Sequence, residues 1–358
     1  MENTAKKKMI IFIAIAYGIS YLMGILMYIG VKQNLDRSVF PVAQMMYPAS
    51  GVIIGKLIYD SKEKALPKLA FILTLICNAI IFVLSIMSIA APQADLEVSG
   101  QTIGFYYMIS NYVLIVFSFV VYILFWACGK EKRENIGIER KNIKLSIAMI
   151  ALFILLYMIR IALAYIIDGI IAGDGFSELT EWLTIFTDSY TWLNIVALPI
   201  NFFVVFLAFF GEEYGWRYYL QPILQNKFGK RWGVLVLGIV WGLWHLPDDF
   251  FYYTTTTGPQ MFVSQLITCV SLGIFFAYAY MKTGNIWVPV IFHYLNNNLI
   301  PIISGVYTSD VLENQSVNWS DLPFALLVDV VFILFICSKE FNANEPIKQT
   351  KEEQTELG

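Results

Sequence analysis

Residues 193–217, LNIVALPINFFVVFLAFFGEEYGWR, join a long apolar run to a cluster of charged side chains. The apolar part is nearly as long as the helix of about 20 residues that crosses the hydrocarbon core of a bilayer. Glu212, Glu213 and Arg217 follow it directly. Ionisable side chains are costly at such a depth and are usually retained for function. The stretch therefore predicts a membrane helix that carries a functional site.

The composition of the whole chain indicates a membrane protein. Of its 358 residues, 58% are apolar and only 14% are charged, and the mean hydropathy is +0.64. A soluble domain has roughly a quarter charged residues. The four cysteines are scattered without a CxxC pair or a secreted-type framework, so we interpret them as packing residues. They are Cys77, Cys128, Cys269 and Cys337.

Apolar segments predict an all-α, polytopic membrane bundle of about ten transmembrane helices. The segments are 9–29, 40–59, 67–90, 104–127, 145–167, 190–211, 232–247, 262–281, 286–304 and 322–337. The first is interpreted as a retained span, because it is too long for a signal peptide and lacks a cleavage site. A charged linker, 129–144, predicts a four-span region over 1–144 and a second domain over 145–338. The polar tail, 339–358, is predicted to be disordered and cytoplasmic.

Lysine and arginine lie almost entirely on alternate loops, which predicts that both termini are cytoplasmic. The opposite loops, 91–103, 168–189, 248–261 and 305–321, contain neither residue. Only Lys32 and Arg37 break the pattern on the outer side. The basic residues thus follow the topology, and nothing in their arrangement supports nucleic-acid binding.

A predicted hairpin brings two ionisable residues to one level. Lys227–Arg231 is a basic, glycine-containing turn. Glu212 precedes Gly229 by 17 residues and His245 follows it by 16. At 1.5 Å per residue, both lie roughly 24–25 Å from the turn. Two antiparallel helices would therefore place Glu212 and His245 at nearly the same height.

The remaining polar residues fit around this pair. Glu213 and Arg217 are four residues apart, in the favourable order for a helical ion pair, which leaves Glu212 free to face elsewhere. His293 and Asn297 share one helix face at the same spacing, whereas Asn296 projects about 100° away from Asn297. One histidine in an apolar helix is usually a packing residue. Two histidines, the only ones in the chain, beside a glutamate and an amide favour chemistry.

This set of residues is suited to hydrolysis, by one of two mechanisms. Glu212 could act as general base on water, His245 could orient that water or protonate the leaving amine, and His293 and Asn297 could stabilise an oxyanion. Alternatively, Glu212, His245 and His293 could hold one divalent metal such as zinc with an open fourth position. The HExxH spacing of ordinary zinc proteases is absent. The spacing does not decide between a metal and no cofactor.

The motifs resemble those of the CPBP intramembrane proteases, the family of CAAX prenyl endopeptidases and bacteriocin-processing (Abi) enzymes. The resemblance covers about residues 190–305. It rests on Glu212-Glu213-x-x-x-Arg217, on Trp241-x-x-x-His245, where the family usually has Phe first, and on His293-x-x-x-Asn297. It implies a glutamic endopeptidase or metalloendopeptidase, in which Glu212 and His245 activate water. His293 and Asn297 would form the oxyanion hole, with Glu213 and Arg217 in support.

The resemblance also implies a substrate and a location. The substrate would be a hydrophobic peptide or membrane-anchored protein in a prokaryotic plasma membrane. Two alternatives stay open: a catalytically silent membrane scaffold or regulator, and a proton-coupled transporter. A transporter would have ionisable residues strung along a pathway, whereas here they gather at about one level. Arg160, alone in the fifth span, has no role in this scheme and either snorkels or pairs with an acid.

Overall fold

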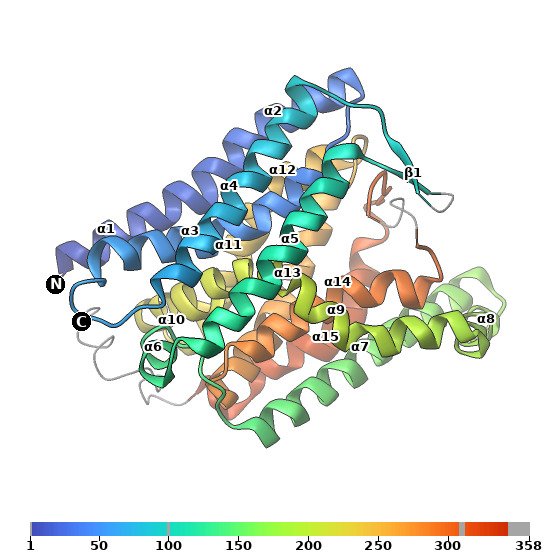
Figure 1. Cartoon of the computed structure of the whole chain (residues 1–358). Helices are drawn as coiled ribbons and strands as arrows, with labels where there is room; N and C mark the ends of the chain where they lie inside the picture. The colour runs from blue at the N-terminus through green and yellow to red at the C-terminus, as the bar shows by residue number, and fades with distance from the viewer. Residues whose placement is uncertain (1, 99–100, 308–311, 343–358) are drawn as a thin grey trace.

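The computed structural model describes residues 2–98, 101–307 and 312–342. Figure 1 shows a bundle of long helices with one small hairpin of strands at its edge. The predicted all-α class is therefore right for the bundle but missed this hairpin, β1–β2, in the loop after the third predicted span. The chain is a polytopic helical membrane protein.

The elements, in chain order, have the following bounds: α1 (Glu2–Ile13), η1 (Ala14–Ile19), α2 (Ser20–Gln33), α3 (Val39–Tyr59), α4 (Lys68–Ala90), β1 (Leu96–Val98), β2 (Gln101–Ile103), α5 (Phe105–Ala127), α6 (Lys130–Asn135), α7 (Ile143–Ala172), α8 (Ser177–Leu183), η2 (Thr184–Thr187), α9 (Ser189–Glu213), η3 (Tyr214–Leu220), α10 (Gln221–Phe228), α11 (Lys230–Trp244), α12 (Leu246–Phe251), α13 (Gly258–Thr283), α14 (Trp287–Ser304), α15 (Leu322–Ile333), η5 (Leu334–Cys337) and η6 (Lys339–Phe341).

Seven of the predicted spans meet the standard of length and hydropathy for crossing a membrane. Within the described residues, seven helices are long and apolar enough to cross a membrane, where the sequence predicted about ten. The three other predicted segments are helical but fall short of this standard. α3 is 21 residues long and α14 is 18, and both have polar and small side chains in their buried faces. α15, extended by η5, is the shorter apolar helix Leu322–Cys337.

One continuous helix of 40 residues, Ser189–Phe228, carries the first motif. Asp188 caps its start by accepting a hydrogen bond from the Tyr190 backbone N–H at 3.0 Å. Its middle part, η3, has π-helical hydrogen bonding, a local widening often found at functional sites. Gly229, with φ of 81°, ends it and begins α11, because a glycine adopts this backbone conformation without steric cost. The predicted basic turn is thus present.

Helix α3 packs directly against the helix that carries the glutamate pair. The close approach requires Gly211 and Gly215. A Cβ on Gly211 would lie 2.5 Å from the Met45 carbonyl oxygen, and one on Gly215 would lie 2.3 Å from Pro48 Cβ. Small residues four apart allow such backbone contact between membrane helices. The division at the 129–144 linker stays a prediction, but the region before it supports the motif helix.

We expect Gly211→Ala to destabilise the protein by about 1–3 kcal/mol, the usual cost of overpacking. The new methyl group would meet backbone atoms of Met45 and Met46, which cannot rotate away. Thermal unfolding in detergent measures the effect. Gly18→Ala is the matched control, because Gly18 is also helical and has nothing within 4 Å of a Cβ. Equal unfolding temperatures for the two variants would contradict the close contact.

Arg160 has the acidic partner that the sequence left open. Its Nε lies 2.5 Å from Asp329 Oδ1, so an ion pair joins α7 to α15. The first residues of the predicted disordered tail are helical. Lys339–Phe341 forms η6, with Phe341 buried and Glu340 paired to Lys282 at 2.7 Å. The rest of the tail, 343–358, lies outside the described residues.

Candidate active site

Glu213 and Arg217 form the expected ion pair. Arg217 Nε donates to Glu213 Oε2 at 2.9 Å, and both side chains are fully buried. The guanidinium carbon of Arg217 lies 4.8 Å from the ring centre of Trp241 and 5.4 Å from that of Phe276. The two aromatic faces stabilise the cation. The pair is thus a buried ion pair next to the other candidate residues.

His293, on α14, lies between the two glutamates. Its Nδ1 donates to Glu213 Oε1 at 2.9 Å, and its Nε2 lies 3.9 Å from Glu212 Oε1. The hydrogen bond fixes the ring orientation and assigns the Nδ1 proton. The distance to Glu212 exceeds a direct hydrogen bond, and one water can bridge such a gap. His293 therefore presents Nε2 to the space beside Glu212.

His245 ends α11 and has its own fixed orientation. Its Nδ1 donates to the Trp241 carbonyl oxygen at 3.0 Å, which leaves Nε2 free to accept a proton. Cys269 Sγ lies 3.7 Å from the same Nδ1. Because that nitrogen already carries the proton for Trp241, it does not deprotonate the thiol. Cys269 packs against the histidine, consistent with its interpretation as a packing residue.

Trp241 connects the residues of the site, and the sequence did not reveal this role. Its Nε1 donates to Glu212 Oε2 at 2.9 Å, while its carbonyl holds His245. Its ring centre lies 5.6 Å from that of His293. The available signal was the residue type: a buried tryptophan needs an acceptor for its N–H. The phenylalanine more usual in this motif could not make this hydrogen bond.

We expect Trp241→Phe to lower kcat roughly 10- to 100-fold and to leave KM nearly unchanged. A hydrogen bond to a charged group contributes about 1.5–3 kcal/mol, and here it positions the carboxylate of Glu212. Steady-state kinetics on any cleaved peptide measure this. Trp287→Phe is the matched control, since the buried Trp287 donates to the Ile138 carbonyl at 2.8 Å, away from the site. Equal losses in both variants would indicate packing alone.

The structure brings five of the six candidate residues together. Glu212, Glu213, Arg217, His245 and His293 are buried and are joined directly or through Trp241. Glu212 and His245 make no direct hydrogen bond, but both bind Trp241. Asn297 is half-buried, and its Oδ1 accepts from Asn296 Nδ2 at 3.0 Å. Its amide N–H groups remain the available donors. It lies one turn beyond His293 on α14.

Glu212, His245 and His293, the alternative metal ligands of the sequence analysis, are not grouped as a ligand set. Among the residues that the structure describes, no three His, Cys, Asp or Glu side chains are grouped to hold a metal ion. Glu212 Oε2, His245 Nδ1 and His293 Nδ1 have protein partners, which leaves both Nε2 atoms available. Because the described side chains are not grouped as a ligand set, no catalytic step is assigned to a metal.

Fold and site together define an integral, multi-pass membrane protein with a buried glutamate–histidine site. Residues 194–299 match the protein family described as type II CAAX prenyl endopeptidase Rce1-like. This segment is an Rce1-like domain of a protease family, as the sequence motifs predicted, and it contains all six candidate residues.

One curated relative supports the same assignment. CAAX prenyl protease 2 of Methanococcus maripaludis is 27% identical to this chain over 106 residues. That alignment covers 28% of this chain and 39% of the relative. No solved structure matches the chain. The family match covers residues 194–299, so the four predicted spans before residue 145 lie outside it.

Proposed function

We propose that this protein is an intramembrane endopeptidase that hydrolyses a peptide bond in a hydrophobic peptide or membrane-anchored protein. The observation that carries the proposal is the buried network in which Trp241 holds both Glu212 and His245, next to His293. The family match supports it, because the related protein is named a prenyl protease. The setting is a prokaryotic plasma membrane, with both termini cytoplasmic.

Glu212 is the general base in this mechanism. It takes a proton from a water molecule, and the water oxygen attacks the carbonyl carbon of the scissile bond. Glu212 is 2% exposed, and the Trp241 N–H fixes one of its oxygens. The other oxygen, Oε1, is directed toward the His293 side of the site. His245, with Nε2 unprotonated, orients the same water. After the attack it takes the remaining proton of that oxygen at Nε2 and passes it to the leaving amine as the C–N bond breaks, which leaves a carboxylate.

His293 and Asn297 stabilise the tetrahedral oxyanion. Glu213 fixes His293 by accepting from Nδ1, so Nε2 is the ring atom that points to the space beside Glu212, and it donates to the oxyanion when the ring is protonated. Asn297 supplies amide N–H groups from the next turn of the same helix. Donors held in place before reaction are the main source of such stabilisation. Arg217 pairs with the other oxygen of Glu213 and so holds the carboxylate that orients His293.

The test is cleavage of a library of hydrophobic peptides, with and without a lipidated C-terminus, by the full-length protein in nanodiscs. We expect cleavage by wild type, unaffected by a zinc chelator, and its loss in His245→Gln and His293→Gln. Folded wild-type protein that cleaves no peptide would overturn the proposal in favour of a silent scaffold. A chelator-sensitive activity would overturn the metal-free mechanism.

A further inference from the structure

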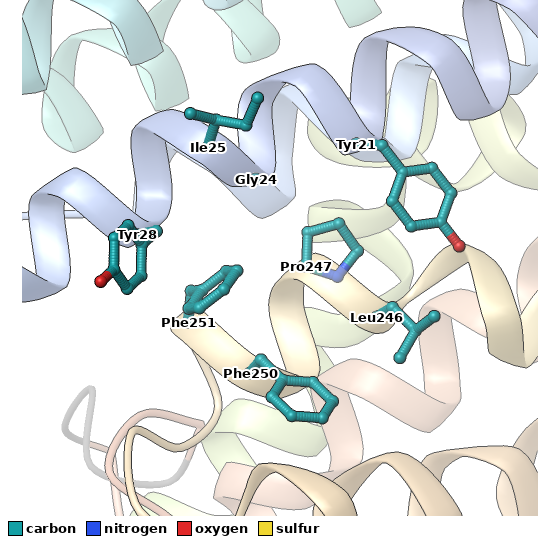
Figure 2. A pocket seen from close by; sticks show the side chains of 8 residues that line it. All are labelled: Tyr21, Gly24, Ile25, Tyr28, Leu246, Pro247, Phe250 and Phe251. Carbon is teal, nitrogen blue, oxygen red and sulfur yellow. The ribbon is translucent and has the colours of Figure 1, made fainter.

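The short helix α12 follows His245 directly and has two chemically different faces. Pro247 and Phe251 point toward α2, and together with Leu246 and Phe250 they line an apolar groove with a cavity of about 370 Å³, shown in Figure 2. The other two residues of this helix are Asp248 and Asp249, which are buried in the protein. The helix thus separates an apolar surface from a pair of interior carboxylates.

Asp248 and Asp249 lack partners. They are 2% and 0% exposed, and neither forms an ion pair within the described part of the chain. Both carboxylate oxygens of Asp249 and Oδ1 of Asp248 are without a hydrogen bond. An isolated buried carboxylate is costly, and buried charges are normally paired. No other residue of the proposed mechanism uses these two groups, so their counter-charge is missing.

The carboxylate pair borders the candidate active site. Both residues follow His245 within about one helical turn, and the Asp249 backbone N–H donates to the His245 carbonyl oxygen at 2.9 Å. Four buried carboxylates here face a single guanidinium, that of Arg217, which is already paired with Glu213. The interior beside His245 therefore holds more carboxyl groups than cations, and a bound cation would stabilise Asp248 and Asp249 in their ionised form. Such a site attracts a cation.

Further acidic groups lie between the pair and the predicted outer surface. Tyr252, at the end of α12, lies within electrostatic range of Asp248 and of Glu313. The Gln315 backbone N–H donates to the Tyr253 carbonyl at 2.8 Å, which holds this loop over the end of α12. The loops on that side contain no lysine or arginine between 91 and 103 or between 305 and 321. A cationic group approaching from there meets only acidic charge in those loops.

We propose that Asp248 and Asp249 form a subsite for a positively charged group of the substrate, an ammonium or guanidinium close to the scissile bond. The subsite selects hydrophobic peptides that carry a lysine, an arginine or a free N-terminal amine beside the cut. This inference rests on the proposed protease function for its location. A metal ion is a poorer occupant, because the described residues supply no third ligand to the pair.

The experiment compares peptides that differ by one charge. Lysine is scanned through the four residues on each side of a cleaved bond, and each peptide is paired with its norleucine counterpart, which has the same apolar stem. At the favoured position we expect wild-type KM to be at least tenfold lower for lysine, a difference of about 1.4 kcal/mol. In Asp248→Asn/Asp249→Asn the two KM values converge, while kcat for the norleucine peptide is retained. A comparison of peptides with acetylated and free N-termini distinguishes an N-terminal amine from a lysine side chain as the source of the ammonium.

Asp174→Asn is the matched control, since Asp174 is an exposed carboxylate of an outer loop. This variant is expected to keep the discrimination. Equal KM values for lysine and norleucine at every position in wild type would overturn the subsite and leave the protease function intact. Binding of the same labelled peptides to the full-length Glu212→Gln protein separates the two ideas. Suppose that binding is selective for lysine and depends on Asp248 and Asp249, while wild type cleaves no peptide. That result would support the subsite and refute the proposed protease function.

Discussion

Glu212→Gln is expected to lower kcat on the order of 10³-fold, within the range of a lost general base. The amide matches the carboxylate in shape and can still accept the Trp241 hydrogen bond through its oxygen. It cannot take a proton from water. KM should change little, because the substitution leaves the binding surface in place. Rates of peptide cleavage, measured with thermal unfolding on the same sample, test this result.

Glu181→Gln is the control for this variant, because Glu181 is an exposed glutamate on α8. Its activity should equal that of wild type. A Glu212→Gln protein that retains a tenth or more of wild-type kcat would rule out Glu212 as the general base. The unfolding temperature serves a separate purpose, since it distinguishes a folded, inactive enzyme from a misfolded one.

Arg217→Met is expected to produce the largest loss of stability, about 3–5 kcal/mol. The substitution leaves Glu213 charged and fully buried, with His293 as its remaining hydrogen-bond partner. The double variant Glu213→Gln/Arg217→Met should recover much of this loss, because it removes both charges together. Thermal or denaturant unfolding in detergent measures both effects.

Lys130→Met provides the comparison, because Lys130 and Glu134 form an ion pair with the same four-residue spacing on the surface. The lysine side chain is 83% exposed, so water and salt screen the pair and its loss should matter little. If Arg217→Met and Lys130→Met had equal effects, burial of the Glu213–Arg217 pair would not be the cause of its importance.

Sequence spacing predicted those parts of the site that depend on one helix or one turn. The Glu213–Arg217 pair follows from helical geometry, and the level of Glu212 and His245 follows from counting around Gly229. Contacts between distant segments could not be derived in this way. The hydrogen bond from Trp241 to Glu212 depends on how two helices are rotated about their axes, and the apolar pattern does not fix that rotation.

Two of the predicted spans, α3 and α14, fall below the hydropathy standard for a physical reason. α3 and α14 are buried in the bundle, and their polar and small residues contact other helices instead of lipid. Hydropathy measures preference for lipid, so it ranks such central helices poorly. Asp248 and Asp249 fall in the predicted outer loop 248–261, because the apolar segment ends at residue 247. They are buried in α12.

Gly211 and Gly215 have an additional consequence for the history of this chain. The family match begins at residue 194, yet the two glycines hold its motif helix against the backbone of Met45 and Pro48. A substitution in α3 at this contact must therefore be compatible with the motif helix, and a substitution in the motif helix must be compatible with α3. The two regions are expected to have diverged together, and an Rce1-like segment grafted from a relative would clash with α3 unless it had small residues at both positions.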